Sequence, residues 1–142
     1  MADPRGHRQP SQRQLRVGEQ MRHLLAEYLA RGEVRDPRLE GASLTISEVR
    51  VSPDLRHATV YVAELGRPVR PEILEVLSRA APRLAGRITR EMHLKYAPRL
   101  RFVADESFEA ADRIERLLAA ARAERRTLAE VEEQREEDER QQ

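Results

Sequence analysis

The order in which hydrophobic periodicity changes along the chain is the feature that most restricts its fold. Residues 12–30 carry apolar side chains at the spacing of an amphipathic helix, whereas residues 44–51 and 57–65 alternate in the manner of strands. A second helical stretch, residues 73–94, precedes a third strand, residues 99–105, and a last helix follows. This order predicts an α+β fold in which helices cover one face of a three-stranded sheet and one sheet edge is exposed.

The first two strands are expected to form a hairpin. Residues 52–55 place a proline at the second position of a turn, and the alternation before them slips once near Ser47 and Glu48, which predicts a β-bulge. Tyr61 and Phe102 raise the possibility of base stacking on the sheet. Because aromatic residues make up only 4% of the chain, core packing is the expected role of both.

Composition predicts one domain with two polar ends. A chain of 142 residues fits a single core. Residues 1–11, with Arg5 and Arg8, are expected to be a flexible basic arm; residues 12–123 form the domain; and residues 124–142 form an acidic tail that is either a helical extension or disordered. The absence of cysteine and of any apolar run near 20 residues excludes disulfides and a membrane span and favours a cytoplasmic protein.

Charge is segregated along the chain although the formal net charge is only +1. Residues 67–101 contain nine basic residues and three acids, and residues 122–142 contain eight acids and five arginines. The basic segment coincides with the second helical stretch and the third strand, so an anionic partner is expected to bind there.

Pro82 lies inside the second helical stretch and is expected to interrupt it. Proline removes one backbone hydrogen bond, and its ring clashes with the carbonyl of the residue four positions earlier, at a cost of about 3 kcal/mol. The expected structure is helix, kink, helix, with Pro82 opening the second part. The N–H groups of Arg83, Leu84 and Ala85 would then be free donors at a helix N-terminus, which attracts anions.

Arginines follow this stretch at spacings of four, four and three residues, which places them on one side of a helix. We call them the arginine stripe: Arg79, Arg83, Arg87 and Arg90. One interpretation is an ordinary solvated helix face; the other is phosphate binding, with small Ala80 and Ala81 allowing a nucleic-acid backbone to approach Pro82. The coincidence of stripe and proline raises the second interpretation to equal standing with the first. Further candidate RNA contacts are Arg5, Arg8, Arg13, Lys95, Arg99 and Arg101.

Catalytic and metal chemistry find little support. Asp54 and His57 lie close in sequence, but no nucleophile, glycine-rich loop or second carboxylate accompanies them, so Asp54 is interpreted as a turn residue. The four histidines lie in different elements without ligand spacing. We therefore expect no enzyme activity, no metal and no cofactor.

A set of short segments carries a family resemblance. They are Arg16-Val17-Gly18-Glu19-Gln20-Met21, Val34-Arg35-Asp36-Pro37-Arg38-Leu39, Val51-Ser52-Pro53-Asp54-Leu55, Ala58-Thr59-Val60-Tyr61-Val62 and Pro98-Arg99-Leu100-Arg101-Phe102-Val103-Ala104-Asp105. In order and spacing, over about residues 12–118, the chain resembles the ribosome-binding factor A family of bacterial small-subunit assembly factors.

The resemblance implies a type II KH-like RNA-binding domain of order α-β-β-α(kink)α-β-α. In that family an Ala-x-Gly kink replaces the usual GxxG loop, and Ala80-Ala81-Pro82 stands at that place here, with proline where the family has glycine. The resemblance further implies binding to free or immature 30S subunits through 16S ribosomal RNA near the decoding region, and non-catalytic support for late maturation and 5′-end processing of the precursor. Other assembly factors are possible partners, no membrane is involved, and a monomer is expected.

An alternative function remains open from the sequence. The exposed sheet edge and the acidic tail would suit a protein-interaction adaptor, with the arginine stripe merely solvated.

Overall fold

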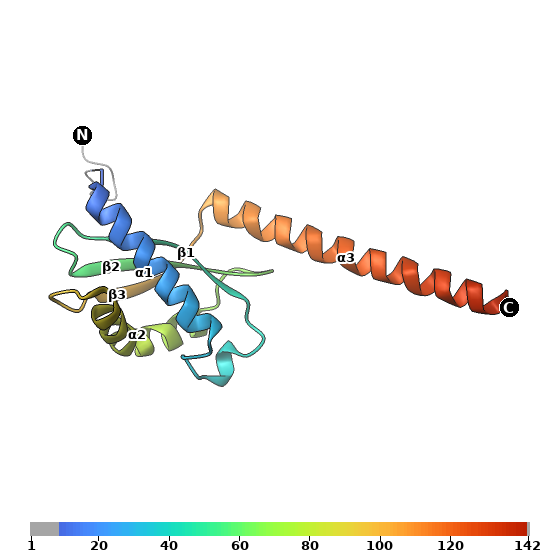
Figure 1. The fold of residues 1–142 in the computed structure, drawn as a ribbon, viewed down its shortest axis with the longest axis horizontal. Coiled ribbons are helices and arrows are strands. Elements are labelled where there is room, and N and C mark those ends of the chain that lie inside the picture. The colour runs from blue at the N-terminus through green and yellow to red at the C-terminus, as the bar shows by residue number, and fades with distance from the viewer. Residues whose placement is uncertain (1–8, 142) are drawn as a thin grey trace. The chain divides into compact units, whose positions relative to one another are not determined.

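The computed structural model describes residues 9–141, so Arg5 and Arg8 of the predicted arm lie outside the described residues. The chain divides into two compact units, Met1–Glu106 and Ser107–Gln142, and each is described by itself. In order, the elements are α1 (Gln12–Ala30), the 3₁₀ turn η1 (Pro37–Leu39), β1 (Leu44–Val51), β2 (His57–Glu64), α2 (Pro71–Met92), β3 (Arg99–Ala104) and α3 (Phe108–Arg140) (Figure 1).

The first unit contains a three-stranded sheet of order β1-β2-β3, which confirms the predicted α+β class. β1 and β2 form the expected antiparallel hairpin, and β2 and β3 run parallel with α2 as the crossover between them. The predicted bulge is present, because the register shifts between Ile46 and Glu48. In the hairpin turn, the Asp54 carboxylate accepts hydrogen bonds from the Arg56 N–H (3.0 Å) and the Ser52 hydroxyl (2.6 Å), as a turn residue should.

The limits of α1 follow from local chemistry. Ser11 caps its start: the Ser11 hydroxyl accepts from the Gln14 N–H (3.1 Å), and the Gln14 side chain accepts from the Ser11 N–H (2.9 Å). Gly32, with φ of +69°, allows the chain to turn away after Arg31. Ser11, the last residue of the predicted arm, is therefore the N-cap of this helix.

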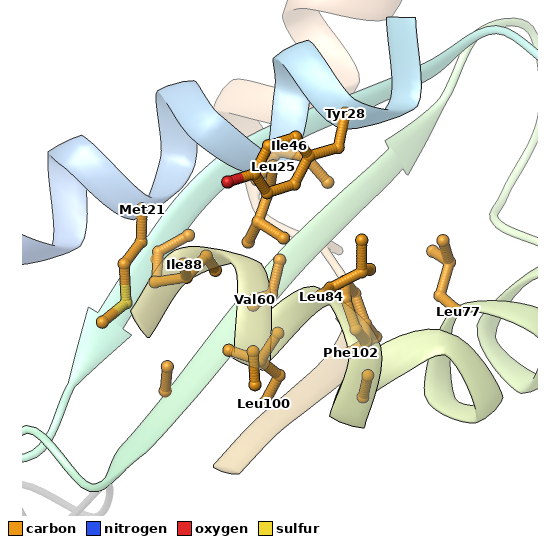
Figure 2. Packing of buried hydrophobic residues seen from close by; sticks show 14 of the residues in the cluster. Met21, Leu25, Tyr28, Ile46, Val60, Leu77, Leu84, Ile88, Leu100 and Phe102 are labelled. Atoms are coloured by element: carbon orange, nitrogen blue, oxygen red, sulfur yellow. The ribbon is translucent and has the colours of Figure 1, made fainter. Parts of the chain in front are cut away.

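The core lies between α1, α2 and one face of the sheet. Met21, Leu25 and Tyr28 of α1 are buried against strand residues, and Leu77, Leu84 and Ile88 of α2 complete the cluster (Figure 2). Phe102 is part of this core, as predicted. The same prediction was wrong for Tyr61, which is half-buried on the opposite face of β2, with the Arg50 guanidinium 5.5 Å from its ring centroid.

The interruption expected at Pro82 is not found in the structure. α2 is one continuous helix of 22 residues with Pro82 inside it. Proline removes only its own N–H, so the single bond that must be missing is the one to the Ser78 carbonyl, and the helix can continue on both sides. Flanking packing stabilises it, because Leu77, Ala81 and Leu84 are all buried against the sheet.

A buried ion pair fixes the connection from β2 to α2. The Glu64 side chain is only 1% exposed and accepts hydrogen bonds from Arg67 (3.1 Å) and Arg70 (2.7 Å). Burial alone would raise the pKa of Glu64, but hydrogen bonding from Arg70 and the charge of Arg67 hold that pKa below its ordinary value. Two of the nine basic residues of the basic segment thus share one carboxylate, which compensates one of their two charges.

The second unit is the helix α3, 33 residues long, which contains most of the predicted acidic tail. Leu117, Leu128 and Val131 are exposed on it at 49%, 64% and 51%. Within residues 9–141, no helix combines the length and apolar character that crossing a bilayer requires.

The backbone of α1 passes very close to β1 at Gly18. A Cβ atom built on Gly18 would lie 2.4 Å from the Val49 carbonyl oxygen, closer than any side chain tolerates. Glycine is therefore required there for steric reasons. Gly86 of α2 offers the contrasting case, since a Cβ atom there would meet nothing within 4 Å.

We predict that Gly18→Ala and Gly86→Ala change stability in opposite directions. Gly18→Ala should lower the free energy of unfolding by about 1–3 kcal/mol, because α1 or β1 must move. Gly86→Ala should raise it by about 0.5–1 kcal/mol through helix propensity alone. Urea denaturation of both variants measures this; a Gly18→Ala protein as stable as the parent would contradict the close packing.

Candidate nucleic-acid interface

Carboxylates neutralise part of the basic segment. Of its nine basic residues, Arg67, Arg70, Arg79 and Arg87 form ion pairs with carboxylates. The other five make no ion pair within the described part of the chain: Arg83, Arg90, Lys95, Arg99 and Arg101. The uncompensated charge therefore lies in two places, on α2 and at the start of β3.

Arg87 of the arginine stripe is half-buried and held by partners within the protein. Its guanidinium carbon lies 4.4 Å from the ring centroid of buried Tyr28, and its nitrogens pair with the carboxylates of Glu33 and Glu91, the latter at 3.0 Å. Hydrogen bonding to Glu33 is the main cause that raises the pKa of Arg87. Arg87 therefore serves to join α2 to the end of α1, with its charge compensated.

The other members of the stripe are more open. Arg79 is 68% exposed and pairs with Glu75, one turn earlier, at 2.5 Å. Arg83 donates to the Glu33 carbonyl oxygen at 2.7 Å, which leaves its positive charge without a counter-ion, and Arg90 is exposed. Arg83 and Arg90 are thus the stripe residues best able to attract a phosphate.

A hollow of about 460 Å³ lies beside Arg83. Its lining contains four arginines and one carboxylate: Arg31, Gly32, Glu33, Arg35, Arg83, Leu84 and Arg87. One Glu33 carboxylate oxygen is buried there without a hydrogen-bond partner. The hollow is mainly cationic, and Glu33 is the one acid in its lining.

The structure changes the expected role of the residues around Pro82. Because α2 is continuous, the N–H groups of Arg83, Leu84 and Ala85 do not form a helix N-terminus, and that part of the predicted anion site is absent. Ala81 is 8% exposed and packs in the core, Ala80 is half-buried and Pro82 is exposed. Any phosphate contact here depends on the arginine side chains.

The additional candidates lie at one end of the sheet. Arg13 is exposed in the first turn of α1, and the Gln14 side chain of the same turn donates to the Val51 carbonyl oxygen (3.0 Å) at the end of β1. Lys95, Arg99 and Arg101 are exposed just before and within β3. Sequence reasoning missed Arg56 and Tyr96, whose side chains stack at this end.

The described acidic and histidine side chains form no metal-binding cluster. Among the side chains that the structure describes, which leave out those of residues 108–114, no group of three or more His, Asp or Glu is arranged to hold a metal ion. The Asp54 carboxylate is engaged within its own turn, where the Ser52 hydroxyl is the main cause that lowers its pKa.

Comparison with known proteins identifies the family. The model of the family described as Ribosome-binding factor A matches residues 13–118. The chain belongs to the ribosome-binding factor A family. A relative of that name from Zymomonas mobilis is 48% identical over 122 residues, which cover 86% of this chain and 84% of the relative.

A crystal structure and a fitted homology model of family members carry the same fold. The crystal structure of ribosome-binding factor A from Thermus thermophilus is 34% identical, with a TM-score of 0.54, and the match covers 64% of this chain and 94% of that one. A T. thermophilus ribosome-binding factor A model, fitted into the map of its complex with the 30S subunit, is 35% identical with a TM-score of 0.50 and covers 61% and 88%. The expected KH-like fold is confirmed.

Tyr28 gives a direct test of the cluster that holds Arg87. Burial, with the nearby Glu91 carboxylate as a further cause, raises the pKa of Tyr28 to about 12. A raised pKa favours the neutral form in the folded state, so its stabilising contribution is complete below about pH 10 and is lost as pH rises through about 12. Absorbance titration of tyrosinate should show a component near pH 12 that Tyr28→Phe removes. A wild-type titration without this component would contradict the burial.

Proposed function

We propose that this chain is an assembly factor of the small ribosomal subunit. It binds free or immature 30S subunits through 16S ribosomal RNA and, without catalysis, supports late maturation and 5′-end processing of the precursor RNA. Family membership supports this proposal, as does the T. thermophilus relative fitted into its 30S complex.

The observation that carries the proposed mode of binding is the unpaired charge on α2. Arg83 and Arg90 make no ion pair in the described structure, although carboxylates compensate Arg79 and Arg87 beside them. A phosphate backbone that approaches this side of α2 meets two guanidinium groups without a counter-ion, of which Arg83 donates one hydrogen bond to the Glu33 carbonyl oxygen. Arg79 is exposed enough to exchange Glu75 for a phosphate, so it is a weaker third contact.

The adaptor alternative is favoured by one feature of α3. Leu128 and Val131 are exposed among the acidic residues of a long helix, a surface suited to a protein partner. A protein partner and an RNA partner differ in their sensitivity to nuclease and to salt, so binding measurements separate the two functions.

We predict that binding to purified small subunits falls steeply with salt and depends on Arg83 and Arg90. Each phosphate contact contributes roughly −0.7 to −0.9 to the slope of log affinity against log salt. Arg83→Ala with Arg90→Ala should therefore weaken binding and make the slope less steep by about 1.4–1.8. Co-sedimentation across a salt series measures both quantities.

The matched control is Arg125→Ala with Arg126→Ala, which removes the same charge from exposed positions of α3. It should change the slope by less than half as much as the α2 variant. Equal effects of the two double variants would mean that net charge alone governs binding, and association that survives complete RNA digestion would support the adaptor instead.

A further inference from the structure

We infer that the end of the sheet around Tyr96 is a second RNA-binding surface, which stacks an unpaired base; the inference rests on the proposed function. We call this surface the Tyr96 platform. It comprises one aromatic ring and four cations: Arg56, Lys95, Tyr96, Arg99 and Arg101. It lies outside α2 and the arginine stripe.

The parallel pairing of β2 and β3 creates the platform. Both strands begin at this end of the sheet, where His57 pairs with Arg99, and the Arg99 N–H donates to the Arg56 carbonyl oxygen at 2.7 Å. The β1–β2 loop and the α2–β3 loop therefore lie side by side (Figure 1). Residues 40 positions apart in sequence, Arg56 and Tyr96, come into contact.

Tyr96 has the exposure and the surroundings of a stacking residue. Its side chain is 47% exposed, the Arg56 guanidinium carbon lies 4.1 Å from its ring centroid, and the Lys95 ammonium lies 5.4 Å from it. The Arg56 guanidinium stacks over the ring, and the ring is still half open to solvent. A nucleobase can therefore stack on the part that Arg56 leaves open, or in place of Arg56, while the neighbouring phosphates meet the cations.

Charge at this end is strongly one-sided. Lys95, Arg99 and Arg101 make no ion pair in residues 9–141, and neither does Arg56. The acids nearest to them in sequence have other partners: Asp54 accepts from the Ser52 hydroxyl and the Arg56 N–H, Glu91 pairs with Arg87, and Asp105 accepts from the Ser47 hydroxyl. A polyanion is therefore the partner that fits by charge.

Backbone conformation holds both loops in place. Among the described residues, the non-glycine residues with positive φ are Leu55 (62°) and His93 (54°), and they stand close before Arg56 and Lys95. Leucine rarely adopts this conformation, and here its buried side chain fixes the turn. At the other loop, the N–H groups of His93 and Leu94 both donate to the Thr89 carbonyl oxygen, the latter at 3.0 Å. The platform is thus ordered before a ligand arrives.

Single-stranded RNA fits this surface better than a duplex. A stacking contact requires an unpaired base, whereas cations alone bind both forms. The platform has one aromatic ring, Tyr96, and Arg56 covers part of it. We therefore expect one stacked base at the platform, with phosphate contacts on either side.

The test uses the full chain, an oligouridylate of about 12 nucleotides, and an RNA duplex of similar length. Tyr96→Ala should weaken oligouridylate binding about tenfold and duplex binding less than about twofold, because one stacked base is lost. Tyr96→Phe should stay within about twofold of the parent for both. Arg126→Ala, at an exposed position of α3, is the charge control and should leave the preference for single strands unchanged.

Tyr96→Trp allows base stacking to be followed by tryptophan fluorescence, which a purely structural role of residue 96 would leave unchanged on RNA binding. The chain contains no tryptophan, so this variant has a single indole reporter. Its emission should be quenched by saturating oligouridylate and much less by duplex. Unquenched emission, unchanged oligouridylate affinity of Tyr96→Ala, or no binding of oligouridylate by the parent would each overturn the platform.

Failure of the platform and failure of the proposed function are distinguishable. A parent protein that does not bind small subunits defeats the proposed function whatever the oligouridylate result. If Tyr96→Ala weakens binding to small subunits but not to oligouridylate, the surface contacts a ribosomal protein and the RNA inference is wrong.

Discussion

The close approach of α1 to β1 at Gly18 is the contact on which the rest of the first unit depends. A Cβ atom on Gly18 would lie only 2.4 Å from the Val49 carbonyl oxygen, so helix and strand meet backbone to backbone. That closeness sets the height of α1 over the sheet and brings Tyr28 to the position where Arg87 of α2 stacks on it. The resulting cluster neutralises Arg87, so packing of the core also decides which arginines of α2 remain available to a partner.

Much of this fold could be predicted from the sequence, because strand alternation and helical periodicity are local signals. The bulge near Ser47 followed from one slip of alternation, and residues 12–30 were predicted as the first helix with the limits that the structure shows. The sequence did not predict the continuous helix through Pro82. Its intrinsic cost as an isolated helix residue predicted a break, but burial of Leu77, Ala81 and Leu84 on both sides stabilises a continuous helix. Tertiary packing outweighed the local preference.

The candidate interface was predictable only in part, because spacing along a helix does not reveal partners elsewhere in the chain. Four arginines on one side of α2 were visible in the sequence, but their charges are compensated differently: Glu33, which pairs with Arg87, comes from the loop after α1. Tyr96 carried no local signal, since its stacking partner Arg56 belongs to another loop. The contact between Tyr96 and Arg56 arises from the β2–α2–β3 crossover, which joins distant loops at one end of the sheet.

The central claim, that the chain supports maturation of the small ribosomal subunit, is tested most directly in cells depleted of the protein and grown at low temperature. Sucrose-gradient profiles combined with mapping of 16S precursor 5′ ends would measure it. The account predicts that free subunits and unprocessed precursor accumulate, and that the parent chain restores processing while the Arg83→Ala, Arg90→Ala variant restores it poorly. Normal profiles and fully processed 5′ ends in depleted cells would contradict the account.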